Sequence, residues 1–129
     1  MKIITRNIRG CNNTLKTKIL RRKIAREKFT IIFLQETKCS EAHLKTTSSK
    51  VWKGSKTMGN DTIGATRGIG ILWNPKEVVL ENFVASEFSL SAEFHIIGTR
   101  VSGVITNIYG PYMAIRKHDF FESLGRTHT

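Results

Sequence analysis

Two polar side chains stand just after apolar segments, where a binding site can form. Asn7 ends the segment Lys2–Asn7, and Glu36 follows the run Thr30–Leu34. If both segments are parallel strands of one sheet, their carboxyl ends meet at the same edge, and ligands of open α/β sheets usually bind beyond that edge. A carboxylate and an amide there form a candidate polar site. The alternative is that Asn7 and Glu36 are two loop residues that face water.

The hydrophobic pattern predicts the elements that would position these residues. Segment Lys2–Asn7 suits a strand, and we expect a helix over Leu15–Phe29 with Thr14 as its N-cap. The apolar residues that recur on one face of this helix are Leu15, Ile19, Leu20, Ile24 and Phe29. The β-branched and aromatic run Thr30–Leu34 indicates a strand covered on both faces. The three elements make a βαβ unit, whose crossover returns the second strand parallel to the first.

Beyond this unit, the sequence predicts a short helix and a series of strands. The helix is Ser40–Ser48, with Ser40 as N-cap, and the polar stretch Lys53–Thr66 is a loop with a strand near Val51–Lys56 as an alternative. The strand segments are Arg67–Trp73, Glu77–Val84, Leu90–Ile97 and Val101–Tyr109, followed by a helical turn or two at Lys117–Leu124. The short connections between the four segments predict antiparallel neighbours.

The positive charge is concentrated at the start of the chain. The net charge is +11, and residues 1–28 hold ten Lys or Arg against the single acid Glu27. The cations on the predicted helix are Lys16, Lys18, Arg21, Arg22, Lys23 and Arg26. Such a cluster can attract a phosphate backbone through counterion release, so we expect these residues to bind nucleic acid. The alternative is a solvated basic helix without a ligand.

Several classes of protein are excluded by the sequence. No apolar run approaches the length of a membrane span and no secretory signal opens the chain, so we expect an intracellular protein, in the nucleus or cytoplasm, with no membrane partner. The two cysteines, Cys11 and Cys39, show neither zinc-ligand spacing nor a disulfide framework, and we predict reduced thiols.

Four short motifs, in order along the chain, carry a resemblance to a known family. They are Asn7-Ile8-Arg9-Gly10, Ile32-Phe33-Leu34-Gln35-Glu36-Thr37-Lys38, Gly68-Ile69-Gly70-Ile71-Leu72-Trp73 and Asn107-Ile108-Tyr109-Gly110-Pro111. This series resembles the opening motifs of the endonuclease/exonuclease/phosphatase superfamily, and within it the endonuclease domain of plant LINE-type (non-LTR) retrotransposons. Four motifs at plausible spacing are far more specific than one.

The resemblance implies a fold, a metal and roles for three residues. The fold is a DNase I-like two-sheet α/β sandwich with a mixed sheet flanked by helices, of which residues 1–129 would be the N-terminal half. Glu36 would be a ligand of Mg²⁺, with Mn²⁺ as an alternative, and Asn7 would orient Glu36 or a metal-bound water. Tyr109 would place its phenol near the scissile phosphate. The implied partner is DNA, contacted through its phosphate backbone.

Departures from the family pattern limit the activity that we expect. Arg6 stands where the family usually has an aromatic residue, and Arg67 stands where a second glycine is common. The later Gly-Asp-Phe-Asn and Asp-His motifs are absent from the sequence, so the base that should activate water is missing. We therefore expect a truncated, inactive endonuclease-type domain. The alternatives are a nucleic-acid-binding remnant that uses the helix 14–28, and half of an active phosphoesterase that a partner chain completes, with self-association through an uncovered sheet face.

Overall fold

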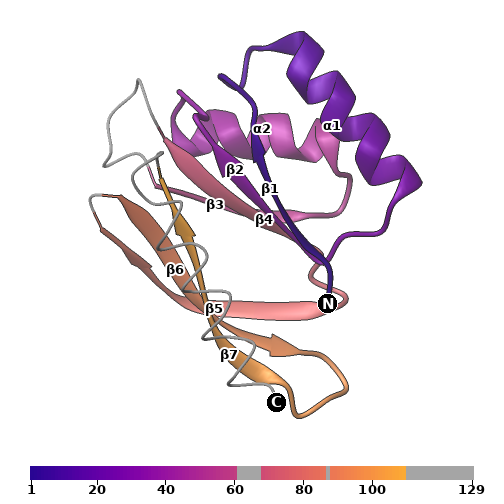
Figure 1. Cartoon of the computed structure of the whole chain (residues 1–129), viewed down its shortest axis with the longest axis vertical. Coiled ribbons are helices and arrows are strands. Elements are labelled where there is room, and N and C mark those ends of the chain that lie inside the picture. Colours follow the sequence, from indigo (N-terminus) through magenta and orange to yellow (C-terminus); the bar gives the residue numbers. More distant parts are fainter. Residues whose placement is uncertain (61–67, 87, 110–129) are drawn as a thin grey trace.

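A computed structural model of the chain describes residues 1–60, 68–86 and 88–109. The elements, in chain order, are β1 (Ile3–Asn7), α1 (Thr14–Arg26), β2 (Ile31–Gln35), α2 (Glu41–Val51), β3 (Lys56–Asn60), β4 (Ile69–Trp73), β5 (Val78–Ala85), β6 (Ser89–Ile96) and β7 (Ser102–Ile108). Four strands form sheet A in the order β1-β2-β4-β3, and three form sheet B in the order β5-β6-β7. Figure 1 shows both helices on one side of sheet A and sheet B on the other.

The βαβ unit predicted from the sequence is confirmed. Strands β1 and β2 are parallel, with Asn7 opposite Gln35. Helix α1 begins one residue earlier than predicted, because the side chain of Asn13, and not Thr14, caps it by accepting from the amide of Lys16 at 3.0 Å. It ends at Arg26, where Glu27 adopts an extended conformation that turns the chain toward β2.

Strand β2 is buried on both faces, as its continuous apolar run predicts. Ile31 and Phe33 point into the core between the two sheets, whereas Ile32 and Leu34 point into the core between sheet A and the helices. This alternation follows from the two-residue period of a strand. On α1, Leu20 is buried, but Leu15 and Ile19 are 66% and 51% exposed, so only part of the predicted apolar face packs.

The strand pairing differs from the prediction at one connection. Strands β5, β6 and β7 are antiparallel neighbours as predicted, but β4 pairs with β2 and β3 and not with β5. The Asn74-Pro75 turn therefore carries the chain from sheet A to sheet B. The strand proposed near residues 51–56 lies instead at Lys56–Asn60, because α2 continues to Val51. The predicted helical turn at Lys117–Leu124 and the Arg67 position lie outside the described residues.

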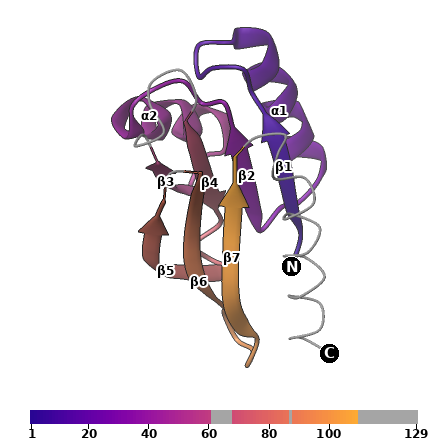
Figure 2. The ribbon, with the colours of Figure 1, turned by 60° about the vertical axis from the view of Figure 1, so that its left-hand side comes forward.

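The two sheets face each other across an apolar core, and Figure 2 shows β7 running in front of sheet A. A buried amide pair joins the sheets at one end of this core. Asn107 of β7, with 0% of its surface exposed, donates to the carbonyls of Leu34 at 3.1 Å and Gly70 at 2.9 Å. Gln35 of β2 donates to the Asn107 side-chain oxygen at 2.9 Å and to the Ile108 carbonyl at 2.7 Å.

A second buried amide joins the sheets nearby. Asn60, the last residue of β3, donates to the carbonyls of Ser86 and Ser89, each at 2.9 Å. Ser86 directly follows β5, and Ser89 is the first residue of β6. The register of sheet A against sheet B is thus held by directional bonds as well as by apolar packing.

Replacing Asn107 should destabilise the fold measurably. Asn107→Ala removes three hydrogen bonds and leaves the carbonyls of Leu34 and Gly70 buried without this donor, so we expect the free energy of unfolding to fall by about 2–4 kcal/mol. Urea denaturation followed by circular dichroism measures the change. The exposed Asn12→Ala is the matched control and should stay within about 0.5 kcal/mol of the parent. Equal losses in both variants would contradict the structural role of Asn107.

Candidate active site

The structure brings the main chains of the three predicted site residues together around Gln35. Asn7 lies opposite Gln35 across the β1–β2 pair, and Glu36 follows Gln35 directly. The Gln35 side chain donates to the Ile108 carbonyl, and Tyr109 is the next residue. Asn7, Glu36 and Tyr109 therefore leave their strands at the same end of the sandwich. Their roles in catalysis and metal binding stay predictions.

Glu36 is held in an unusual backbone conformation. Its φ is +52°, in the left-handed region that costs a non-glycine residue about 1–2 kcal/mol. Its carbonyl accepts from the Gly10 amide at 2.7 Å, and the neighbouring Thr37 amide donates to the Gly68 carbonyl at 3.1 Å. Gly68 (φ +67°) can approach this closely because it has no Cβ, and a Cβ at this position would collide with the Thr37 hydroxyl. The loop is thus fixed from two sides.

The Glu36 side chain is half-buried directly after β2. Within the described residues its carboxylate makes no hydrogen bond or ion pair, unlike Glu27 and Glu41, which have basic partners. The same part of the chain contains no group of three or more His, Cys, Asp and Glu side chains that could enclose a metal. One carboxylate suits Mg²⁺, which commonly takes one or two protein carboxylates together with phosphate oxygens and waters.

Asn7 and Tyr109 have local contacts in addition to their position. Asn7 is exposed, and its side-chain oxygen accepts from the Arg9 amide at 2.9 Å, which shapes the turn after β1. The described residues include no hydrogen bond between Asn7 and Glu36, so the orienting contact that the resemblance implies stays a prediction. Tyr109 is half-buried against the inter-sheet core, and its amide donates to the Phe88 carbonyl at 2.7 Å.

The fold is shared with several solved structures. The chain is similar to the endonuclease/exonuclease/phosphatase from Bacteroides vulgatus, with 10% identity, a TM-score of 0.61, and coverage of 81% of this chain and 49% of that one. The AP endonuclease LMAP from Leishmania major has 17% identity, a TM-score of 0.60, and coverage of 97% and 46%. A humanized D. rerio TDP2 has 14% identity, a TM-score of 0.56, and coverage of 95% and 53%.

The chain has their fold. The predicted fold class, a two-sheet α/β sandwich with a mixed sheet flanked by helices, is therefore confirmed. The chain spans about half the length of these structures. No protein-family model matches the sequence, and a search of the curated proteins finds no match. The similarity to solved structures establishes the fold alone. The resemblance to the retrotransposon branch stays a prediction.

The two cysteines form a disulfide, so the prediction of reduced thiols is wrong. Cys11 follows β1 and Cys39 follows β2, and their Cα atoms are 6.4 Å apart. The Cys11 amide also donates to the Thr37 carbonyl at 2.8 Å. A spacing of 28 residues gives no hint of this, because it is the parallel β1–β2 pairing that brings the two turns together. The bond ties the turn after Asn7 to the turn that carries Glu36.

The cations of α1 divide into those that line a hollow and those that do not. Lys16, Lys23 and Arg26 line a hollow beside β1, whereas Lys18, Arg21 and Arg22 are exposed and lie outside that lining. The sequence predicted all six as one binding set. Neither helix of the described residues is long and apolar enough to cross a membrane.

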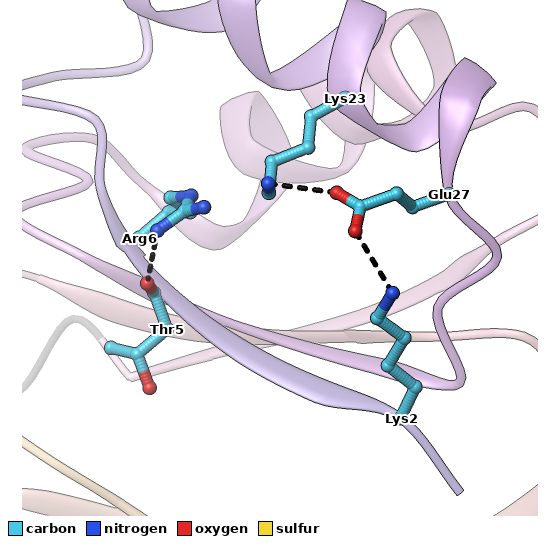
Figure 3. A network of polar contacts seen from close by, with 5 residues as sticks. All are labelled: Lys2, Thr5, Arg6, Lys23 and Glu27. Atoms are coloured by element: carbon cyan, nitrogen blue, oxygen red, sulfur yellow. Dashed lines mark hydrogen bonds and ion pairs between the residues drawn. The ribbon is translucent and has the colours of Figure 1, made fainter.

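Glu27 is the acid that partners this basic region. Its two carboxylate oxygens meet the ammonium groups of Lys23 at 2.7 Å and Lys2 at 2.9 Å, as Figure 3 shows. The hydrogen bonds from Lys23 and then Lys2 lower the pKa of the Glu27 carboxyl from 4.5 to about 2. Glu27 thereby links the start of β1 to the end of α1.

Sequence reasoning assigned no role to three buried or charged neighbours of the site. Gln35 and Asn107 carry the inter-sheet clamp, the hydrogen bonds that join the two sheets. Gln35 is the polar last residue of the otherwise apolar β2, a signal that could have indicated it, whereas Asn107 stands among polar as well as apolar residues in β7. Arg6 had been noted only as a departure from a family pattern. Its guanidinium lies between β1 and α1 in Figure 3.

Thiol labelling tests the disulfide. We expect the denatured chain to gain no maleimide without reductant and two maleimides after reduction, measured by mass spectrometry. Reduction should also lower the free energy of unfolding by about 2–4 kcal/mol, because the bond closes a loop in the unfolded chain. The double variant Cys11→Ser, Cys39→Ser should be insensitive to reductant. Two reactive thiols in the unreduced chain would rule the bond out.

The Glu27 ion pairs should give the stability a defined pH dependence. A carboxylate with a lowered pKa stabilises the fold fully above its unfolded value of 4.5 and loses that contribution as the pH falls toward about 2. The Tm difference between the parent and Glu27→Gln should therefore be constant above about pH 5 and narrow at lower pH. Because the pairs are partly exposed, salt should reduce this difference. A Tm difference that does not change with pH would contradict the assignment.

Proposed function

We propose that this chain is the N-terminal part of a divalent-metal-dependent phosphodiesterase domain of the retrotransposon-endonuclease type. In this proposal Glu36 is the metal ligand, Asn7 and Tyr109 flank the phosphate, and the chain by itself binds nucleic acid without cleaving it. The observation that carries the proposal is the carboxylate of Glu36. It is half-buried and without a protein partner among the described residues, at the end of the sandwich where Asn7 and Tyr109 also leave their strands.

The chemistry follows from the residue types. A bound Mg²⁺ would neutralise charge on phosphate oxygens. Glu36, at a left-handed turn, would supply an anionic oxygen ligand. The Asn7 amide nitrogen can donate to a metal-bound water or phosphate oxygen, because the contact found in the described part of the chain engages its oxygen, with the Arg9 amide. The Tyr109 hydroxyl can donate to a phosphate oxygen as charge develops there.

The proposed lack of cleavage rests on the missing general base. The sequence contains two aspartates, Asp61 and Asp119, and neither stands in a Gly-Asp-Phe-Asn or Ser-Asp-His context. Without a carboxylate or histidine to accept a proton from water, the attack on phosphorus loses a contribution of typically about 10²–10⁴ in rate. We therefore assign metal and phosphate binding to this chain and assign no turnover to it.

Nucleic acid is the second element of the proposal. The +9 region at residues 1–28 supplies the attraction, since it opposes ten cations to one carboxylate. That carboxylate, Glu27, is already engaged by Lys2 and Lys23. The relation to the fold of an AP endonuclease is consistent with a phosphodiester ligand.

Manganese as a paramagnetic probe tests the metal site directly. In ¹⁵N NMR spectra of the whole chain, we expect Mn²⁺ to broaden the amide signals of Gly10 and Glu36–Lys38 first, because these amides surround the Glu36 turn. Glu36→Gln should abolish this selective broadening. Glu81→Gln, which removes an exposed carboxylate on sheet B, is the matched control and should preserve it. Broadening that survives in Glu36→Gln would overturn the assignment of Glu36.

A nicking assay tests the absence of turnover. Supercoiled plasmid incubated with the chain and Mg²⁺ should show no cleavage above the level of the Glu36→Gln variant. Metal-dependent nicking by the parent that Glu36→Gln eliminates would refute the inactive state and support the metal site at the same time.

A further inference from the structure

A basic hollow lies between the edge strand β1 and helix α1. Its volume is about 370 Å³, and its charged lining consists of Arg6 from β1 and Lys16, Lys23 and Arg26 from α1. In Figure 3 the side chains of Arg6 and Lys23 both reach into the space between the strand and the helix. Asn7 is also part of the lining, so the hollow reaches the end of β1 where the candidate active site begins.

The cations of this hollow are poorly neutralised by the protein itself. No acid belongs to the lining found in the described residues. Lys23 shares Glu27 with Lys2, whereas Lys16 and Arg26 have no acidic partner in that part of the chain. Arg6 makes one long hydrogen bond, at 3.5 Å, to the neighbouring Thr5 carbonyl, so most of its five N–H donors remain unused among the described residues. An anionic ligand would satisfy them.

The shape and the apolar part of the lining restrict the ligand. The apolar part of the lining is Ile8, Ile19 and Leu20, and Ile19 is 51% exposed although it belongs to the apolar face of α1. Lys16 and Arg26 are separated by about 15 Å along the helix axis, at 1.5 Å per residue. A basic hollow of about 370 Å³ and this length suits one sugar–phosphate strand and is too small to enclose a duplex. Among the described residues, its lining contains no aromatic side chain on which bases could stack.

We propose that this hollow binds the backbone of a single nucleic acid strand, without base preference, and leads it toward Asn7. The inference rests on the proposed function in one respect, that the ligand is a nucleic acid. Arg6, Lys16, Lys23 and Arg26 contact phosphates, and Ile19 contacts the sugar edge. Lys18, Arg21 and Arg22, which lie outside the lining of the hollow, do not take part.

Fluorescence anisotropy with a labelled oligothymidylate, measured in EDTA over a series of salt concentrations, tests this division. The variant that removes charge from the hollow, called the groove variant, combines Arg6→Gln, Lys16→Gln and Arg26→Gln. The control variant combines Lys18→Gln, Arg21→Gln and Arg22→Gln, and loses the same charge. Each phosphate contact to a single strand contributes about 0.7 to the slope of log affinity against log salt. We expect the groove variant to lose about 2 from this slope and at least about tenfold in affinity, and the control to change much less.

Two outcomes would overturn the proposal. One is an equal loss in both variants, because net charge alone would then explain the binding. The other is binding of a duplex of the same length that is as tight as the single strand and equally sensitive to the groove variant. The Ile19 methyl signal gives a reading that does not depend on any variant: it should shift when the oligonucleotide is added to the parent chain, while that of Val79 on sheet B should not. An unshifted Ile19 would also overturn the proposal.

Glu27 supplies a variant that should strengthen binding. Glu27→Gln frees Lys2 and Lys23, so single-strand affinity should rise several-fold at low salt, and an unchanged affinity would count against Lys23 as a contact. Glu81→Gln on sheet B, by contrast, should leave affinity in EDTA unchanged. The two proposals can therefore fail separately. The anisotropy experiment can contradict the strand-binding hollow while manganese still broadens the signals around Glu36, or the reverse.

Discussion

The arrangement of the two sheets depends on a small set of buried amide hydrogen bonds. Asn107 reaches from β7 to main-chain carbonyls of β2 and β4, and Gln35 returns the contact to Asn107 and Ile108. Apolar packing alone is not directional and would tolerate small shifts of one sheet over the other, whereas buried amides that lose their partners cost free energy. The clamp lies beside Glu36 and Tyr109. The hydrogen bonds that fix the two sheets therefore also fix how far apart these two residues lie in space.

Much of the fold could be predicted because its signals are local. The apolar run of β2, the alternation along β6 and the capping serine of α2 each depend on residues near in sequence. The partner of β4 could not be predicted, since the short Asn74-Pro75 turn resembles a hairpin and only tertiary packing decides that it joins two sheets. Strand β3 was misplaced because Lys56–Asn60 carries little apolar pattern.

The candidate site divides in the same way. Asn7, Glu36 and Tyr109 could be named from motifs, and their common location follows from the parallel β1–β2 pair and the Gln35 bond to Ile108. The Cys11–Cys39 bond, the clamp by Asn107 and the part played by Arg6 are contacts between segments far apart in sequence. Neither the composition of the chain nor the spacing of its residues indicates these contacts. Their common cause is the convergence of several chain turns at one end of the sandwich.

Strand β1 is an edge of sheet A among the described strands, and an unpaired edge invites a strand from another molecule. Here Lys2 and Arg6 lie along that edge, and the cations of α1 that line the hollow lie beside it. A second copy that approached edge to edge would bring its own cations against these, and like charges at such a distance repel. The cations beside β1 therefore oppose the pairing of this edge with the same edge of a second copy, which would otherwise extend the sheet from chain to chain.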